Sequence, residues 1–471
     1  MKSIPYIQNV LILGVVITMV GCGADKEKEP TLEESSLSAQ LMTTLNEQLD
    51  GGAVGLQLPQ SSDFSSIPAD PNNALTEEKV SLGMMLFHET AVATEGVHEQ
   101  LVNTWSCASC HHVAAGFKSG VVQGIGEGGT GFGVAGEMRV LTEGFDKSSS
   151  DPSLIPDVQP LTSPSILNTA YQEVMLWNGQ FGNQDGGLIN AELPSEILAT
   201  PGTPKAENMR GLGGLETQAI AGTKVHRLNT FNNSFVQQNI EYQLLYEAAF
   251  PEGGDDILEN MGKAIAAYER TVLANQAPFQ RWLQGEDAAL TDQEKRGGLL
   301  FFGKAGCASC HTGPALSSNI GAANEEMFMA IGFADLDTSN PEITGVVTEN
   351  DAKGRGGFTG RIEDNYKFKV PQLYNLKDSN VFGHGGSFTS VEQVVLYKNA
   401  GVPQKRLADG VIDERFVPLN LNDEEIDDLV AFLEEGLYDP HLDRYVPDAL
   451  PSGACFPVAD EQSKIDLNCA P

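Results

Sequence analysis

Basic residues are scarce in this chain. Its 471 residues include 29 Lys and Arg against 64 Asp and Glu, which gives a formal net charge of −35 at pH 7. Such a surface repels phosphate backbones and anionic lipid, so nucleic acid and acidic membrane surfaces are poor partners. The charge favours a cationic protein partner, although it would equally serve to keep an exported protein soluble.

Long apolar runs are also missing. The longest, residues 10–20, is too short to span a bilayer as a helix and is typical of a signal peptide. It ends in Met19-Val20-Gly21-Cys22, which resembles the lipobox of bacterial lipoproteins. The resemblance implies cleavage after residues 1–21 and acylation of Cys22, hence a lipid-anchored periplasmic protein, and Gly23 favours the outer membrane. An ordinary cleaved signal peptide is the alternative.

Cysteines are few, and each can be assigned. Of the seven, Cys22 belongs to the lipobox-like motif, and four lie in two Cys-Ala-Ser-Cys-His pentads at 107–111 and 307–311. Cys455 and Cys469 remain. In an oxidising compartment, these two are expected to form a disulfide that pins the C-terminal tail.

The pentads predict two covalently bound haem c groups. Two thiols three positions apart add to the two haem vinyl groups, and the next histidine then ligates the iron. A disulfide or a zinc site is the less favoured alternative. The predicted thioether positions are Cys107, Cys110, Cys307 and Cys310, and the predicted axial ligands are His111 and His311.

Alternating strand patterns are rare, but a helical pattern occurs twice. Leu75-Thr76-Glu77-Glu78 recurs 215 residues later as Leu290-Thr291-Asp292-Gln293. Each threonine can cap a helix that leads into a pentad, and Glu294 completes a capping box with Thr291. A second helix is expected after each pentad, at about 256–273 and 422–435.

These patterns predict a mainly α fold with two cytochrome c-like haem domains in tandem, joined and covered by long Gly-rich loops. The predicted divisions are a signal peptide at 1–21, a flexible tether at 22–70, an N-terminal haem domain at 71–285, a C-terminal haem domain at 286–445 and a disulfide-pinned tail at 446–471.

Several further motifs accompany the pentads: Leu176-Trp177-Asn178-Gly179, Tyr268-Glu269-Arg270-Thr271, Phe368-Lys369-Val370-Pro371 and Gly383-His384-Gly385-Gly386-Ser387-Phe388. Together with the pentads they resemble the bacterial diheme cytochrome c peroxidases and the related MauG-type enzymes, from about residue 71 to 438. The resemblance implies that the haem on His111 binds hydrogen peroxide. It also implies that the haem on His311 is six-coordinate and relays or stores an electron.

The same resemblance implies residues on the far side of the first haem. It places Trp177 between the haems and Gln218 above the first one. A glutamate expected ten residues later is replaced by Leu228, and a gap of two residues would bring His226 to that position, beside Arg227. Imidazole can shuttle the peroxide proton, and guanidinium can stabilise the departing oxygen. Two alternatives stay open for His226, an iron ligand or a surface histidine.

The sixth ligand of the second haem departs from the family pattern. Where the peroxidases have Met and MauG-type enzymes have Tyr, ungapped counting gives Lys398, with Tyr397 beside it. Either ligand would lower the reduction potential relative to a His/Met haem. A more distant methionine, Met327 or Met329, is the alternative.

The family also implies a calcium ion between the haem domains. Its asparagine ligand position corresponds to Thr162 here, and its carbonyl ligands fall near Ser379 and Val381. Carbonyl ligands survive substitution, but the loss of the asparagine puts the calcium in doubt.

Three functions follow as hypotheses. The first is a periplasmic peroxidase that reduces hydrogen peroxide with electrons from a small redox protein, a cytochrome c or a cupredoxin. The second is a MauG-like enzyme that uses peroxide-derived high-valent haem to modify residues of a partner protein. The third is a non-catalytic electron-transfer cytochrome. The membrane is reached only through the lipid anchor, and a homodimer is left open.

Overall fold

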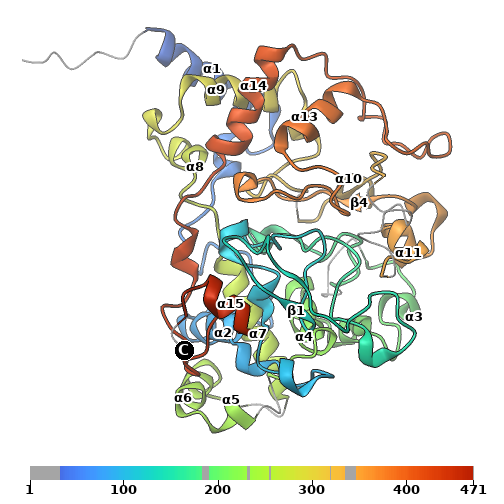
Figure 1. The fold of residues 1–471 in the computed structure, drawn as a ribbon. Coiled ribbons are helices and arrows are strands. Elements are labelled where there is room, and N and C mark those ends of the chain that lie inside the picture. The colour runs from blue at the N-terminus through green and yellow to red at the C-terminus, as the bar shows by residue number, and fades with distance from the viewer. Residues whose placement is uncertain are drawn as a thin grey trace, which may run out of the picture.

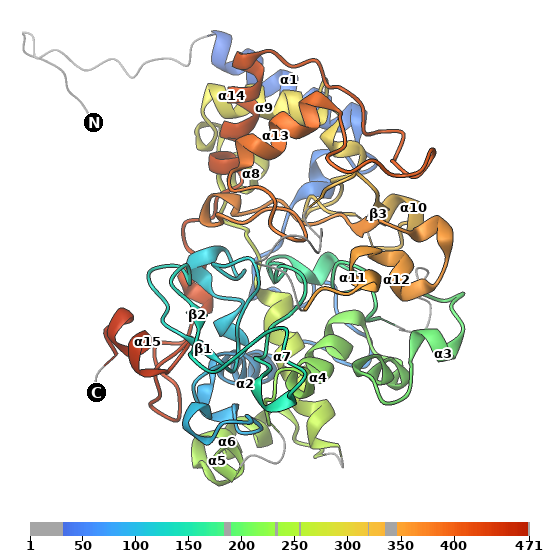
Figure 2. The ribbon, with the colours of Figure 1, turned by 45° about the vertical axis from the view of Figure 1, so that its right-hand side comes forward.

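The chain folds into two helical lobes, one above the other in Figures 1 and 2. The computed structural model describes residues 32–182, 190–230, 234–253, 256–318, 320–334 and 346–469. The predicted signal peptide, residues 1–21, and Cys22 lie outside these ranges. Within them, no helix combines the length and apolar character needed to cross a membrane. The predicted mainly α class is confirmed, since helices dominate and strands are few.

The N-terminal lobe carries the first pentad. Its helices are α2 (Glu77–His88), α3 (Ser195–Leu198), α4 (Gly214–Val225), α5 (Ser234–Gln238), α6 (Ile240–Ala249), α7 (Ile257–Thr271) and α15 (Glu461–Asp466), and its strands β1 (Gly129–Thr130) and β2 (Val140–Leu141) pair antiparallel. Helix α2 packs against α7. Gly83 makes this close approach possible, because a Cβ there would lie 1.9 Å from the carbonyl oxygen of Ala264.

The C-terminal lobe carries the second pentad. Its helices are α1 (Leu32–Gln48), α8 (Pro278–Leu283), α9 (Asp292–Phe302), α10 (Asn324–Met327), α11 (Glu349–Ala352), α12 (Arg355–Thr359), α13 (Val391–Ala400) and α14 (Asp423–Ala431), with antiparallel strands β3 (Phe328–Met329) and β4 (Phe368–Lys369). Helix α9 packs against α14. Gly297 is the contact point, since a Cβ there would lie 2.0 Å from the Asp428 carbonyl oxygen.

The predicted helix starts are confirmed. The Thr76 hydroxyl accepts the Lys79 amide at the start of α2. Thr291 and Glu294 form a reciprocal capping box on α9, and Asn422 and Glu425 form another on α14. Each cap satisfies backbone amides that the first helical turn leaves without a partner. The repeated pattern therefore gives the same arrangement twice, a capped helix before each pentad and a second helix packed across it.

The flexible tether predicted over residues 22–70 is wrong for its described part. Helix α1 packs against α9 at the top of Figure 1, with Leu41 and Leu45 fully buried. The segment after this helix is also held by hydrogen bonds: the Leu58 amide donates to the Gln280 side chain at 2.8 Å, and the Asn275 side chain donates to the Pro59 carbonyl at 2.7 Å. The polar composition of this segment hid an apolar i, i+4 pair that packs one face of the helix into the core.

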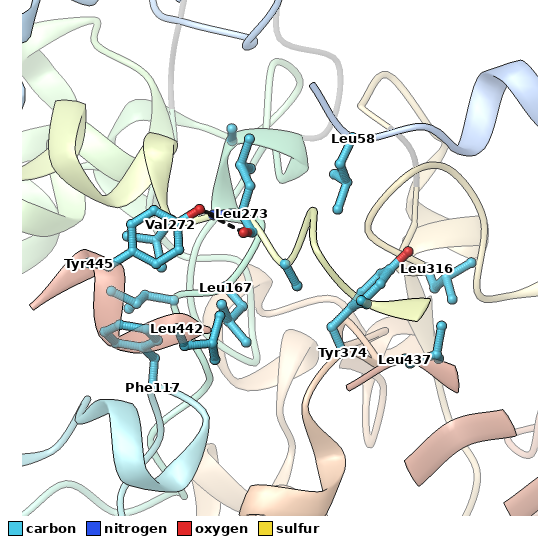
Figure 3. Close-up of a cluster of buried hydrophobic side chains, with 14 of the residues drawn as sticks. Leu58, Phe117, Leu167, Val272, Leu273, Leu316, Tyr374, Leu437, Leu442 and Tyr445 are labelled. Carbon is cyan, nitrogen blue, oxygen red and sulfur yellow. Dashed lines mark hydrogen bonds between the residues drawn. The ribbon is translucent and has the colours of Figure 1, made fainter. Parts of the chain in front are cut away.

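The two lobes share a hydrophobic core. Figure 3 shows Phe117, Leu167 and Val272 from the N-terminal lobe facing a set from the C-terminal lobe that includes Leu316 and Tyr374. The Tyr445 hydroxyl donates to the Leu273 carbonyl at 2.7 Å inside this cluster. Burial of this extent fixes the lobes relative to each other.

The C-terminal tail returns to the N-terminal lobe, where α15 lies beside β1. Cys455 and Cys469 form the predicted disulfide, with their Cα atoms 5.8 Å apart. The buried Arg139 guanidinium pairs with Asp460 at 3.2 Å. The tail is therefore both closed on itself and tied to the Gly-rich loop that follows the first pentad.

Candidate functional site

The two pentads adopt the same local structure. In each, the first three residues form a single 3-10 turn, and the histidine amide donates to the carbonyl of the first cysteine, at 3.1 Å for His111 and 2.9 Å for His311. All four pentad cysteines are free thiols, so neither pentad is closed by a disulfide. No group of three or more His, Cys, Asp or Glu side chains suited to a metal ion occurs among the described residues. The zinc alternative therefore has no ligand set there.

The protonation states suit covalent haem. Burial raises the pKa of the Cys107 and Cys307 thiols to about 12, so both are protonated at neutral pH. Burial also lowers the pKa of His111 and His311 to about 4, so both imidazoles are neutral at neutral pH. Neutral imidazole is the form that ligates iron. Neutral thiols and a neutral histidine on one turn fit a haem c group in each lobe.

The second pentad opens onto a cavity of about 320 Å³. Its wall carries both thiols and His311, and its lining is largely apolar, including Phe301, Val395 and Leu429. The Leu316 carbonyl lies 2.9 Å from Nδ1 of His311. That partner fixes the proton on Nδ1 and leaves Nε2 as the ligating atom.

The residues proposed as sixth ligands are separated by the structure. Lys398 lines the cavity. Burial lowers the pKa of its amine, although the nearby thiols of Cys310 and Cys307 act to raise it. Tyr397 is absent from the described lining; its hydroxyl donates to the Ile331 carbonyl. Met329 also lines the cavity, with its sulfur 2.8 Å from the Arg415 guanidinium, whereas Met327 packs in a separate cluster. The geometry thus brings Lys398 and Met329, rather than Tyr397, to the space beside His311.

Trp177 lies between the pentads in the chain and also lines this cavity. Its indole nitrogen donates to the Thr162 carbonyl at 2.8 Å, and its ring centroid is 6.1 Å from that of His384. The indole is therefore held by the N-terminal lobe while its ring meets His384 of the C-terminal lobe in a T-shaped contact. Its position between two haems stays a prediction.

Beside the first pentad, His226 is paired with a carboxylate that the sequence did not reveal. Its Nδ1 atom lies 3.1 Å from both carboxylate oxygens of Asp157. Burial by itself would lower the pKa of His226, but Asp157 outweighs it and raises the pKa. The indole of Trp105 donates to the His226 carbonyl at 2.8 Å. His226 in turn contributes to the lowered pKa of His111, so the two rings interact electrostatically.

Arg227 and Gln218 are placed differently from His226. The Arg227 guanidinium forms an ion pair with the fully buried Glu127 and donates to the Ile155 carbonyl at 3.1 Å. Its charge is therefore already balanced within the protein. Gln218 lies on α4, and no hydrogen bond among the described residues joins it to His226. Asp157 and Glu127 lie in loops without a recognisable motif, so no local sequence signal could have found them.

The surroundings of the two pentads differ at their serines. Ser109 is 2% exposed, and its hydroxyl donates to the Pro457 carbonyl of the tail at 2.8 Å. Ser309, its counterpart, is exposed. The disulfide-closed tail therefore covers Ser109 of the first pentad, whereas Ser309 of the second pentad is open to solvent.

The implied calcium site does not fit these residues. Thr162 has no carboxamide, and its hydroxyl donates to the Gly383 carbonyl at 3.1 Å. The Val381 carbonyl accepts the ammonium of Lys118 at 2.7 Å. A dication placed at that oxygen would be repelled by the ammonium, so no step is assigned to calcium.

Several known proteins are similar to this chain. Residues 77–288 match a family model described as di-haem cytochrome c peroxidase. Cytochrome-c peroxidase IdrP1 of Denitromonas iodatirespirans is 27% identical over 391 residues, which cover 80% of this chain and 86% of that protein. The methylamine utilization protein MauG of Methylorubrum extorquens is 27% identical over 371 residues, which cover 78% and 81%.

One solved structure supports the fold. A MauG-like protein associated with microbial copper homeostasis superposes with a TM-score of 0.54 and 23% identity, over 82% of this chain and 95% of that one. The shared region includes both lobes. At this identity the similarity shows the fold alone, and the two sites must be argued from their own residues.

Proposed function

The chain belongs to the family of di-haem cytochrome c peroxidases and MauG proteins, and on that premise we propose that it reduces hydrogen peroxide with electrons from a small redox protein. It is a haem-dependent oxidoreductase, each lobe acting as one cytochrome c-like haem domain. One observation carries the proposal: the two pentads are identical, but the first has the His226–Asp157 pair beside it and the second has Lys398. The acid–base pair suits a first haem that reacts with peroxide, and the amine suits a second haem that stores an electron.

The first site supplies the acid–base group. A haem attached through Cys107 and Cys110, with its iron ligated by His111, would supply the redox chemistry. Asp157 holds the Nδ1 proton of His226, so Nε2 is the atom that takes the proton from peroxide and returns it to the departing oxygen. Arg227 acts as a positioning residue, because Glu127 already neutralises it. Gln218 is proposed as a polar neighbour of the bound peroxide.

The second site stores the electron. Its haem would be held by Cys307 and Cys310, and His311 and Lys398, which line the same cavity, would be the residues that ligate its iron. An amine ligand in place of methionine lowers the reduction potential. Trp177 lies where an electron would cross between the lobes.

The proposed setting is the periplasm, with a lipid anchor on Cys22 and the outer membrane favoured. The net charge of −35 supports a cationic cytochrome c or cupredoxin as the donor. The exposed face around Ser309 is the accessible one for such a donor, since the tail covers Ser109. This arrangement sends electrons to the second haem first.

A MauG-like function is the second candidate, and Lys398 is the observation that favours it. A low-potential second haem accepts electrons from ordinary cytochromes less readily and stabilises an oxidised diheme state. Such a state could modify residues of a partner protein. A non-catalytic cytochrome would require His226 to ligate the first iron instead.

The deciding experiment is the addition of stoichiometric peroxide to the diferric protein and to the one-electron-reduced protein, followed by visible, near-infrared and electron paramagnetic resonance spectra. Reaction after one-electron reduction, with turnover of reduced cytochrome, is the expected result. Reaction of the diferric form to a long-lived product with little cytochrome oxidation would favour the MauG-like function. Absence of any reaction in both states would exclude both enzymatic functions.

A further inference from the structure

The contact between the lobes contains the ammonium of a half-buried lysine at the place where the family implies a metal ion. Lys118, seven residues after His111, extends from the N-terminal lobe into the C-terminal lobe. Its Nζ donates to the Val381 carbonyl at 2.7 Å and to the Ser379 hydroxyl at 3.2 Å. The same atom lies 5.4 Å from the ring centroid of Phe382. These partners are two neutral oxygens and an aromatic face, which are groups that bind cations.

Lys118 forms no ion pair with any described carboxylate. Its side chain also borders the cavity of the second pentad. Burial lowers the pKa of its amine to about 8, yet it keeps a charged form at neutral pH. A buried charge is tolerated only where oriented dipoles replace its water, and the Val381 and Ser379 oxygens provide them.

Three carbonyl oxygens around this point have protein donors. The Gly383 carbonyl accepts the Thr162 hydroxyl at 3.1 Å, and the His384 carbonyl accepts the Thr162 amide at 2.9 Å. The Thr162 carbonyl accepts the Trp177 indole at 2.8 Å. Carbonyls engaged in this way are poor ligands for an added dication, which needs six to eight oxygens.

We propose that the Lys118 ammonium is a built-in cation that joins the two lobes in place of calcium. The shared apolar core beside it, which includes Phe117, supplies most of the contact area (Figure 3). Lys118, which follows Phe117 in the chain, adds charged hydrogen bonds to Ser379 and Val381, in the segment that leads to His384. The protein is then independent of divalent cations, and removal of this one amine weakens the junction.

The test begins with the wild-type holoprotein, which avoids any question of folding in a variant. After dialysis, its calcium content is measured by mass spectrometry, and its melting temperature and low-spin resonance signals are recorded with and without a chelator. We expect no bound calcium and no change on chelation. Stoichiometric calcium, or a fall in melting temperature with chelator, would overturn the proposal.

Variants then test the amine itself. Lys118→Met removes the amine and keeps the aliphatic part of the side chain. Lys79→Met is the matched control, because the Lys79 amine also donates to a carbonyl, that of Ala74 at 3.0 Å, and lies 5.5 Å from the centroid of the Phe250 ring. All of these contacts of Lys79 are within one lobe. We expect Lys118→Met to lower the melting temperature by about 5 °C, since a hydrogen bond from a charged group is stronger than a neutral one. The control should lower it by less.

Chemical rescue separates a charge effect from a packing effect. In Lys118→Ala, propylammonium chloride should restore part of the lost melting temperature, whereas propanol should not. Equal effects of the amine and the alcohol, or equal losses in Lys118→Met and Lys79→Met, would show that the ammonium is not the link. Failure of the peroxide reaction would leave these readouts unaffected, so they test the proposal independently of the proposed function.

Discussion

Lys398 lines the cavity beside His311, whereas the hydroxyl of its neighbour Tyr397 donates to the Ile331 carbonyl. Consecutive residues of a helix point about 100° apart, so α13 can present one of the two to the second haem. Burial lowers the pKa of the Lys398 amine, which makes the neutral, ligating form more accessible. The sequence could not choose between them, because a shift of one residue in the alignment reverses the answer.

Exchanging these residues should therefore have unequal effects. We expect Lys398→Met to raise the reduction potential of the second haem and to alter its low-spin resonance signal. Tyr397→Phe should leave that signal unchanged and cost about 1 kcal/mol of stability through the lost hydrogen bond. Potentiometric titration and resonance spectra measure both, with Met329→Leu as the third variant. A signal lost in Tyr397→Phe and kept in Lys398→Met would contradict the assignment.

The His226–Asp157 pair predicts a pH dependence of the peroxide reaction. The base is the neutral form of His226, and Asp157 raises the pKa of that imidazole. The rate should therefore increase with pH, and the midpoint of the increase should lie above the ordinary pKa of histidine. Asp157→Asn removes the carboxylate charge and should move the midpoint of this rate increase to lower pH. His226→Gln should slow the reaction by about 10²–10⁴-fold. Stopped-flow rates against pH give both results.

Asp146→Asn is the control for this experiment. Asp146 is an exposed carboxylate in the same loop region, and among the described residues its side chain bonds only to Ser148. Its removal should leave the pH profile unchanged. If Asp157→Asn and Asp146→Asn gave the same profile, the pairing would have no part in proton transfer. A first haem that became high-spin in His226→Gln would instead identify His226 as an iron ligand.

Local patterns predicted the parts of this fold that depend on local chemistry. Thr76, Thr291 and Asn422 are found as helix caps because capping is decided within four residues. The Asp157–His226 pair spans 69 residues between loops, and no periodicity reports such a contact. The described part of the predicted tether, residues 32–70, was misjudged for a different reason: its polar composition suggested a tether, while Leu41 and Leu45, with the partly buried Met42 and Leu49, pack helix α1 into the core.

The C-terminal tail has one feature that the sequence predicted and one that it did not. Its disulfide was predicted because two cysteines remained in an oxidising compartment. Its docking site was not, because the bonds from Ser106 and Ser109 to the Pro457 carbonyl join residues about 350 positions apart.

Breaking the disulfide should loosen this cover. Cys455→Ser opens a 14-residue separation, for which loss of the cross-link costs about 3 kcal/mol. Urea unfolding should show that loss, and limited proteolysis should cut the tail before the rest of the chain. Treatment of the wild type with a reductant should have the same effect. A tail that stays protected in Cys455→Ser would show that the Arg139–Asp460 pair is sufficient to hold it.

Glu269 carries the last prediction. It lies next to Arg270 in α7, is 5% exposed, and its Oε2 atom has no hydrogen-bond partner among the described residues. Burial raises the pKa of this carboxyl to about 8, and the Glu216 charge adds to the effect while Arg270 opposes it. Arg270 is bound to both oxygens of Glu216, at 2.9 and 2.7 Å, which explains why it does not neutralise Glu269.

The sign of the pH effect follows from proton binding. Between the ordinary carboxyl pKa and about 8, the folded state keeps the Glu269 proton and the unfolded state has lost it. Stability therefore falls as pH rises through this window, by at most about 1.4 kcal/mol per unit from this group. Glu269→Gln keeps the shape and removes the titration, so its unfolding free energy should decline less steeply. Urea midpoints measured at intervals across the window test this, and parallel curves for the two proteins would show that Glu269 is ionised in the fold.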